Sequence, residues 1–227
     1  MRRGSVLVTR PEPGAAETGS RLVTLGWHPI LAPALVLTPR PFAPVARAQA
    51  LLLPSRAAAR SLTPWNIPVI GVGAATAEAA RARGFGQVQA AEGDAAALAR
   101  LCAATLDPTA GPLLLAVGAG YSLDLAAALR AHGFAVIRRV VYAASEAEAL
   151  PDTALAALRS GAVSHALFFS PRSAACSLAL LAASGLPVSG ISAIAISPRV
   201  AGALGALPWR RILVAKRPDQ DHILELL

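Results

Sequence analysis

The side chains best able to bind an anion lie where short apolar runs give way to helical patterns. Arginine there can grip a carboxylate through two parallel hydrogen bonds, and a helix amino terminus offers free N–H groups and partial positive charge. Serine and threonine at such places also cap helices, so each position alone has a structural explanation. Together the junctions favour a ligand with many carboxylates. The junctions are Thr9-Arg10, Ser55-Arg56, Gly73 to Thr76, Val117-Gly118, Ser170 to Arg172 and Ser197 to Arg199.

One tyrosine adds a possible acid to these anion-binding groups. Tyr142 ends the run AVIRRVVYA, and Tyr121 is the only other tyrosine in the chain. Its hydroxyl could act as a weak acid at the mouth of a cleft, although the spacing alone favours a packing role for the ring. The predicted substrate-binding residues are Thr9, Arg10, Ser55, Arg56, Gly73, Thr76, Gly118, Ser170, Arg172, Ser197 and Arg199.

Other common kinds of site are missing from the sequence. The four histidines are isolated, and no pair has the spacing of metal ligands on one face. The chain contains no phosphate-binding loop ending in GK[ST], no GxGxxG after the first strand and no GxSxG. Cys102 and Cys176 fall in separate alanine-rich helical patterns, which favours packing over a disulfide. We therefore expect neither metal nor cofactor.

A degenerate internal repeat indicates two related modules. Residues 51–62 read LLLPSRAAARSL and residues 167–178 read LFFSPRSAACSL, with six identical positions among twelve. The match resumes where VIGVGAATAEAA (69–80) aligns with AIAISPRVAGAL (193–204). Each copy passes from an apolar run of strand length into a helical pattern. Two α/β modules of this kind suggest a ligand at the carboxyl ends of their strands.

Alternating strands and helices predict parallel sheets with both faces covered. Prolines 39, 41 and 44 mark one crossing between modules, and the run 135–143 returns the chain. The fold class is thus α/β, with two doubly wound parallel-sheet domains of related topology, the first discontinuous: 1–36 with 146–227, and 37–145. Two crossings suit a cleft that opens and closes. The expected strands are 5–9, 28–37 with an interruption at Pro33, 49–53, 68–72, 87–91, 112–117, 135–143, 165–169, 192–197 and 211–215. The expected helices are 15–25, 56–63, 74–83, 94–105, 121–131, 151–159, 172–183, 198–206 and 219–226.

The chain has a positive net charge, but its basic residues are not arranged as in a nucleic-acid-binding protein. Lys and Arg number 21 against 13 Asp and Glu, and Lys216 is the only lysine. The basic residues are scattered and aromatic residues make up only 4%, so we expect no nucleic-acid partner. The uncharged stretch 173–198 is divided by Pro187 and Gly190, which argues against a membrane span. We expect a cytoplasmic monomer whose partner is a small molecule.

The junctions lie within longer segments that resemble one enzyme family, the uroporphyrinogen-III synthases. The resemblance extends in order over nearly the whole chain, although each motif alone is short. The chain departs from the family's usual residues at Pro54, Val117 and Val200. The matching segments are VLVTRPEPGA, LGWHPILAPAL, VIGVGAATAEAARARGF, LRAHGFAVIRRVVYAA, ALFFSPRSAA and AIAISPRVAGAL.

The resemblance implies two α/β domains joined by a two-stranded connector, with the active site between them. It also implies a cofactor-free lyase of tetrapyrrole (haem) biosynthesis. Such an enzyme cyclises hydroxymethylbilane, a linear tetrapyrrole with eight carboxylates, with loss of water and inversion of ring D. Tyr142 would then hydrogen-bond the departing hydroxyl. The alternative is a non-catalytic two-domain protein that binds a small polyanionic metabolite.

Overall fold

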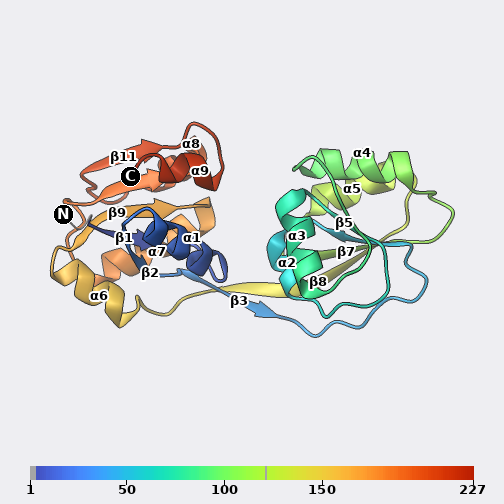
Figure 1. Ribbon diagram of the computed structural model, residues 1–227, viewed down its shortest axis with the longest axis horizontal. Helices are drawn as coiled ribbons and strands as arrows, with labels where there is room; N and C mark the ends of the chain where they lie inside the picture. The colour runs from blue at the N-terminus through green and yellow to red at the C-terminus, as the bar shows by residue number, and fades with distance from the viewer. Residues whose placement is uncertain (1–3, 121) are drawn as a thin grey trace. The chain divides into compact units, whose positions relative to one another are not determined.

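The computed structural model describes residues 4–120 and 122–227, and the chain divides into two compact units. Unit 1 comprises Met1–Val36 and Ser145–Leu227, and unit 2 comprises Leu37–Ala144. Each unit is a predominantly parallel sheet with helices on both faces, as Figure 1 shows. The expected α/β fold class with two doubly wound sheets is therefore confirmed.

The sheet of unit 1 combines strands from both ends of the chain. Its order is β11-β10-β9-β1-β2, and all four neighbouring pairs are parallel. The first strand thus pairs with a strand about 160 residues later, since Leu7 lies opposite Ala166. This pairing confirms the predicted discontinuity. The strands are β1 (Ser5–Val8), β2 (His28–Leu31), β9 (Val163–Phe168), β10 (Ser192–Ala195) and β11 (Arg211–Val214).

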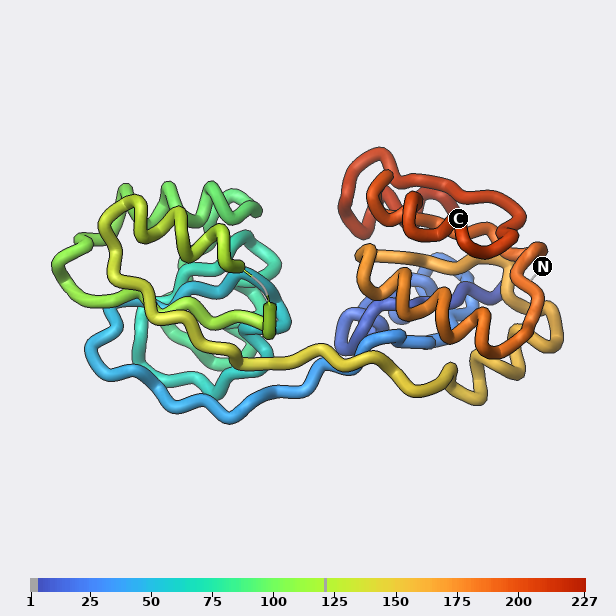
Figure 2. Tube along the Cα trace, turned by 180° about the vertical axis from the view of Figure 1, so that it is seen from behind, coloured from blue at the N-terminus to red at the C-terminus, as the bar shows by residue number. Residues whose placement is uncertain are grey.

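Alternate side chains of these strands enter two cores on opposite faces of the sheet. On one face Ala166 and Phe168 pack with α6, α7 and α8, and on the other Leu167 packs with α1 and α9. Figure 1 shows α1 in front of the sheet, and Figure 2, from behind, brings α7 forward. The inner strands β1 and β10 are buried on both faces and carry the apolar runs VLV and AIA. The helices are α1 (Gly14–Thr24), α6 (Asp152–Arg159), α7 (Pro171–Ser184), α8 (Pro198–Ala203) and α9 (Gln220–Leu224).

Unit 2 repeats this arrangement. Its sheet has the order β3-β8-β7-β4-β5-β6, with α2 and α3 on one face and α4 and α5 on the other. Tyr121, where one helix was expected to begin, lies outside the described residues. The strands are β3 (Leu35–Pro39), β4 (Ala50–Leu53), β5 (Val69–Gly71), β6 (Val88–Ala90), β7 (Leu113–Gly118) and β8 (Val136–Glu146). The helices are α2 (Arg56–Arg60), α3 (Ala74–Arg83), α4 (Ala95–Thr105) and α5 (Leu123–Ala131).

The extended segment 28–37 is interrupted at Pro33, as the sequence predicts. The segment forms two strands, β2 and β3, which change partners around Pro33. The N–H group of Ala34 still donates to Thr9 at the end of β1, but its carbonyl accepts from Ala147 beyond β8. Further along, Arg40 donates to Val141, so β3 and β8 run antiparallel. Proline cannot donate a ladder hydrogen bond, which explains the break.

His165 of the unit 1 sheet lies in an environment that disfavours a positive charge on its ring. It lies in β9, with its ring edge-on to Trp27 at 5.2 Å between centroids and Nδ1 3.0 Å from the Ser164 hydroxyl. Burial, and then the positive charges of Arg211 and Arg210, lower its pKa below the ordinary 6.5. The folded protein therefore favours the neutral ring.

Acidification should consequently weaken unit 1. Because the pKa of His165 is lower in the folded chain than in the unfolded chain, its contribution is present above pH 6.5 and is lost as the pH falls. The free energy of unfolding in urea, compared at about pH 7.5 and about pH 5.5, should fall less in His165→Gln than in the parent. An equal fall in both proteins would contradict the assignment.

Candidate functional site

The predicted residues of unit 1 gather at one edge of its sheet. Thr9 follows β1, Ser170 follows β9 and Ser197 follows β10, and these three strands are neighbours. The backbone ladder continues past the strands, since Thr9 donates to Leu167 and Ile196 donates to Phe168. Parallel strands place their carboxyl ends at the same edge, so these turns lie side by side.

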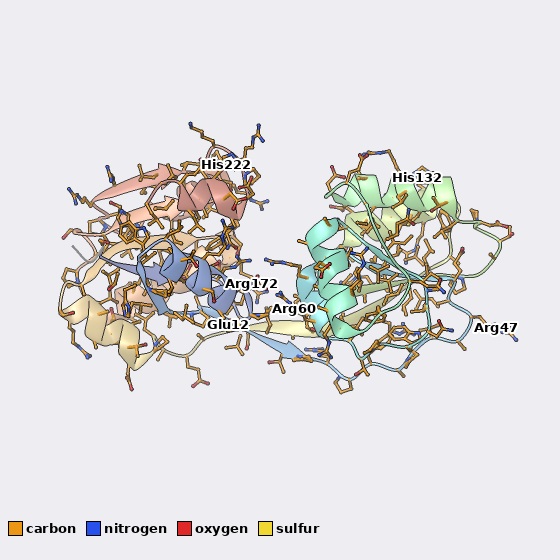
Figure 3. The ribbon with its side chains drawn as sticks, in the orientation of Figure 1. Glu12, Arg47, Arg60, His132, Arg172 and His222 are labelled. Atoms are coloured by element: carbon orange, nitrogen blue, oxygen red, sulfur yellow. The ribbon has the colours of Figure 1, made fainter. Side chains whose placement is uncertain are left out.

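Ser170 and Ser197 cap two helices in the same way. Each begins a Ser-Pro-Arg sequence in which serine is the cap, proline is the first helical residue and arginine is the second. The Ser170 hydroxyl accepts from the N–H of Ser173, and the Ser197 hydroxyl accepts from that of Val200. Proline suits this position because its missing N–H would have no helical partner. Figure 3 labels Arg172 at the start of α7.

Arg10 is held inside unit 1 by contacts from several segments. Its Nη1 donates to Thr18 Oγ1 at 3.2 Å and to Gln220 Oε1 at 2.9 Å, and its guanidinium lies 4.4 Å from the ring centre of Phe169. A Cβ atom on Gly14 would come within 2.5 Å of Arg10 Nε, so glycine leaves room for the side chain. Arg10 therefore joins β1, α1 and α9.

The hydroxyl of Thr9 is also engaged within unit 1. The side chain is buried, and its Oγ1 donates to the carbonyl of Leu167 at 2.7 Å. This bond ties the end of β1 to β9. Thr9 and Arg10 both lie at the predicted edge, and both have structural roles there.

In unit 2 the predicted residues lie at the corresponding edge. The Ser55 hydroxyl caps α2 by accepting from the N–H of Ala58 at 3.1 Å, and Arg56 is the first helical residue. Gly73 caps α3 without a side chain, and Thr76 in its first turn is only 4% exposed. A Cβ on Gly73 would approach Gly93 Cα to 3.0 Å. The glycine thus permits close packing of two neighbouring turns.

Tyr142 and Gly118 form one packed pair in unit 2. They are paired across β7 and β8, and Tyr142 is 8% exposed within the core that contains Val141 and Leu53. A Cβ on Gly118 would come within 2.5 Å of Tyr142 Cζ and 2.7 Å of its hydroxyl oxygen. Glycine at 118 therefore lets the phenol lie across the end of β7, so the ring has a packing role whatever its hydroxyl does.

The caps divide the helices into two kinds. Acidic side chains occupy three amino termini: Glu12 accepts from Ala16 in α1, Asp94 accepts from Ala97 in α4, and Asp219 accepts from His222 in α9. The helices α5 and α6 carry Asp124 and Asp152 in their first turns. By contrast, α2, α3, α7 and α8 have neutral caps and no acidic residue in the first turn. Only a terminus without its own carboxylate retains a positive end for another anion. Each unit has two such helices.

Neither cysteine is suited to nucleophilic chemistry. Burial raises the pKa of the Cys102 thiol to about 11. The pKa of Cys176 is raised by burial and then by the nearby carboxylate of Glu146. Thiolates are the reactive form, so both residues act as packing groups. Within residues 4–120 and 122–227, no group of three His, Cys, Asp or Glu side chains could hold a metal ion.

The turn between β11 and α9 was not among the predicted substrate-binding segments. Lys216 and Arg217 follow β11 at the same edge as Ser170 and Ser197, and Gln220 in α9 holds Arg10. The segment PWRRILVAKRPD shows a strand followed by two cations. That pattern was the available signal, but it contains no serine, threonine or glycine junction.

No helix of the described chain is both long and apolar enough to cross a membrane.

Two α/β units, one of them built from both ends of the chain, define a two-domain α/β protein with helix amino termini at the carboxyl edges of its sheets. The family model for "Uroporphyrinogen-III synthase HemD" matches residues 16–225. The chain therefore belongs to the uroporphyrinogen-III synthase family. The resemblance found in the sequence motifs is thereby confirmed.

Solved structures agree with this family at the level of the fold. The uroporphyrinogen-III synthetase of Helicobacter pylori is 15% identical, with 99% of this chain and 98% of that chain covered and a TM-score of 0.64. A mutant uroporphyrinogen III synthase of the extremely thermophilic bacterium Thermus thermophilus is 17% identical, with coverage of 97% and 96% and a TM-score of 0.48. A comparison with curated proteins finds no match.

The contact between Tyr142 and Gly118 predicts a stability effect. Gly118→Ala should lower the free energy of unfolding by about 1–3 kcal/mol, because the added methyl group must displace the phenol or the end of β7. Gly86→Ala is the matched control in the same unit, since a Cβ there meets nothing within 4 Å. It should change stability by less than about 0.5 kcal/mol in the same urea titration. Equal effects of the two substitutions would contradict the packing.

Proposed function

We infer from the family match over residues 16–225 that the chain is an enzyme that converts hydroxymethylbilane to uroporphyrinogen III. The reaction closes the linear tetrapyrrole with loss of water and inversion of ring D, in the biosynthesis of haem and other tetrapyrroles. The two-domain α/β fold is that of the structurally similar H. pylori enzyme. No comparison supports the alternative of a non-catalytic binding protein.

We propose that both units bind substrate carboxylates at the carboxyl edges of their sheets. The longest neutral-capped helices, α3 and α7, supply N–H groups there, and Ser55 and Ser197 begin two shorter helices at the same edges. The adjacent Arg56, Arg172 and Arg199 add cations. Such recognition suits a substrate with eight carboxylates, because it distributes binding over many groups.

We propose that the protein holds the substrate in one folded form and thereby selects one ring closure. The free bilane closes spontaneously without inversion, so catalysis consists mainly of orientation. Tyr142 is the proposed hydrogen-bond donor to the departing hydroxyl. Support comes from its place on β8 beside Gly118, next to the edge that carries the neutral helix termini. No bound metal or cofactor takes part in this proposal.

We further propose that the enzyme acts as a cytoplasmic monomer without a nucleic-acid partner. Two buried, unpaired cysteines suit a reducing compartment. Each described sheet is covered on both faces by helices of its own unit, which suits a chain that folds without a second copy.

A product assay tests the proposed activity. With no added metal or cofactor, and with a chelator present, the protein should convert hydroxymethylbilane to the type III isomer and suppress the type I isomer. Chromatography of the oxidised products separates the two. The type I isomer alone, at high protein concentration, would contradict the proposal and favour the binding protein instead.

Tyr142→Phe tests the proposed catalytic hydroxyl. The substitution keeps the ring that packs on Gly118 and removes only the hydroxyl, so turnover should fall by about ten- to a hundredfold if that group assists the loss of water. The free energy of unfolding should change by less than about 1.5 kcal/mol, the scale of one hydrogen bond. Unchanged turnover in a stable variant would assign Tyr142 to packing alone.

A further inference from the structure

The turn between β11 and α9 extends the anion-binding edge of unit 1 by one strand. Val214, Ala195 and Phe168 are paired across β11, β10 and β9. Two residues beyond these partners come Lys216, Ser197 and Ser170 respectively. The only lysine of the chain therefore occupies the register position that the two helix-capping serines occupy on the neighbouring strands.

The turn is fixed at both of its ends. Ala215 donates to the carbonyl of Ala195, and the N–H of Asp219 donates to the carbonyl of Arg217. Gln220, the first residue of α9, accepts from Arg10 at 2.9 Å. Arg10 is thus a positioning residue, which connects the end of β1 to the segment that carries Lys216 and Arg217.

The cations of this turn have no acidic partner. Among the described residues, neither Lys216 nor Arg217 forms an ion pair or side-chain hydrogen bond, and both are exposed. The nearby acids are engaged elsewhere, because Asp219 binds its own helix at His222 and Asp221 pairs with Arg21 at 2.6 Å. Two charges without counter-ions at the edge of a binding surface attract anionic ligands.

The equivalent turn of unit 2 has the opposite charge. It connects β6 to α4 through Ala91 to Asp94 and carries Glu92 and Asp94 with no cation. The two units therefore share one fold but differ in the charge of this turn at the edge of the sheet. Of these two turns, only that of unit 1 carries positive charges that attract a carboxylate.

We propose that Lys216 and Arg217 bind carboxylates of the tetrapyrrole, in addition to the groups at Ser170 and Ser197. The inference depends on the proposed function, because it assigns that function's substrate to these two side chains. Unit 1 thus binds the ligand along three neighbouring strand ends, from β9 to β11, through hydroxyl-capped helices and two cations.

Protection of the lysine provides a test that does not require turnover. Lys216 is the only lysine, so its acetylation by an amine reagent can be followed by peptide mass spectrometry. Stable, oxidised uroporphyrin III at about ten times its Kd should slow the reaction about tenfold, because only the free fraction reacts. Inorganic phosphate at equal ionic strength should not protect it.

An internal control comes from the other end of the same strand. Arg210→Lys introduces an amine just before β11, at an exposed position without a side-chain partner among the described residues. Uroporphyrin III should leave acetylation at position 210 unchanged while it protects Lys216. Equal protection at both positions, or none at Lys216 in a protein that binds uroporphyrin III, would overturn the proposal.

Charge-matched double variants test the energetic contribution. Lys216→Ala/Arg217→Ala should bind uroporphyrin III about two- to twenty-five-fold more weakly, since each exposed charge contact is worth about 0.2–1 kcal/mol. Its affinity should also depend less on salt. Arg159→Ala/Arg210→Ala removes two exposed charges at the opposite edge and should bind as the parent does. Equal weakening by both pairs would overturn the assignment.

Loss of the hydrogen bond between Arg10 and Gln220 should weaken ligand binding less than loss of Lys216 and Arg217 does. Gln220→Ala changes no charge, yet it should reduce the protection of Lys216 and raise KM more than it lowers kcat, because the turn loses its tie to Arg10. Formation of the type III isomer without protection of Lys216 would refute this inference alone. Absence of both the type III isomer and uroporphyrin III binding would refute the proposed function as well.

Discussion

The parallel pairing of the strands is the constraint on which the rest of this protein depends. It brings the carboxyl ends of β1, β9, β10 and β11 to one edge in unit 1, and those of β4, β5 and β7 to one edge in unit 2. Helices begin immediately beyond those ends, so their amino termini collect at the same edge. A row of anion-binding groups then follows from the backbone itself, before any side chain is chosen.

Side chains decide which of these groups remain available. Where a carboxylate of the chain accepts from the first turn of a helix, as Glu12 does in α1 and Asp94 in α4, the terminus is already neutralised. Where serine or glycine is the cap, the terminus keeps its partial charge. The small neutral caps Ser170 and Gly73 therefore mark the helices that we propose bind the substrate, whereas helices with an acidic side chain at the amino terminus support the sheet.

The same logic explains why the two related units need not contribute equally. Their folds share the order of strand, turn and helix, yet the turn before α9 carries Lys216 and Arg217 while the turn before α4 carries Glu92 and Asp94. A turn at the edge of a sheet can change its charge without disturbing the core, because its side chains are exposed. The two units share a fold, and their electrostatics differ.

The sequence alone determined the elements, the discontinuous first unit and the family, because apolar runs, prolines and junction motifs are local signals. Pro33 marked the interruption of segment 28–37, but the sequence could not show that the chain there exchanges β1 for β8 as its partner. Nor could it show that Arg10 is held by Thr18, Phe169 and Gln220. Whether a cation is engaged or available depends on residues as far as 210 positions away, and only the tertiary structure brings them together.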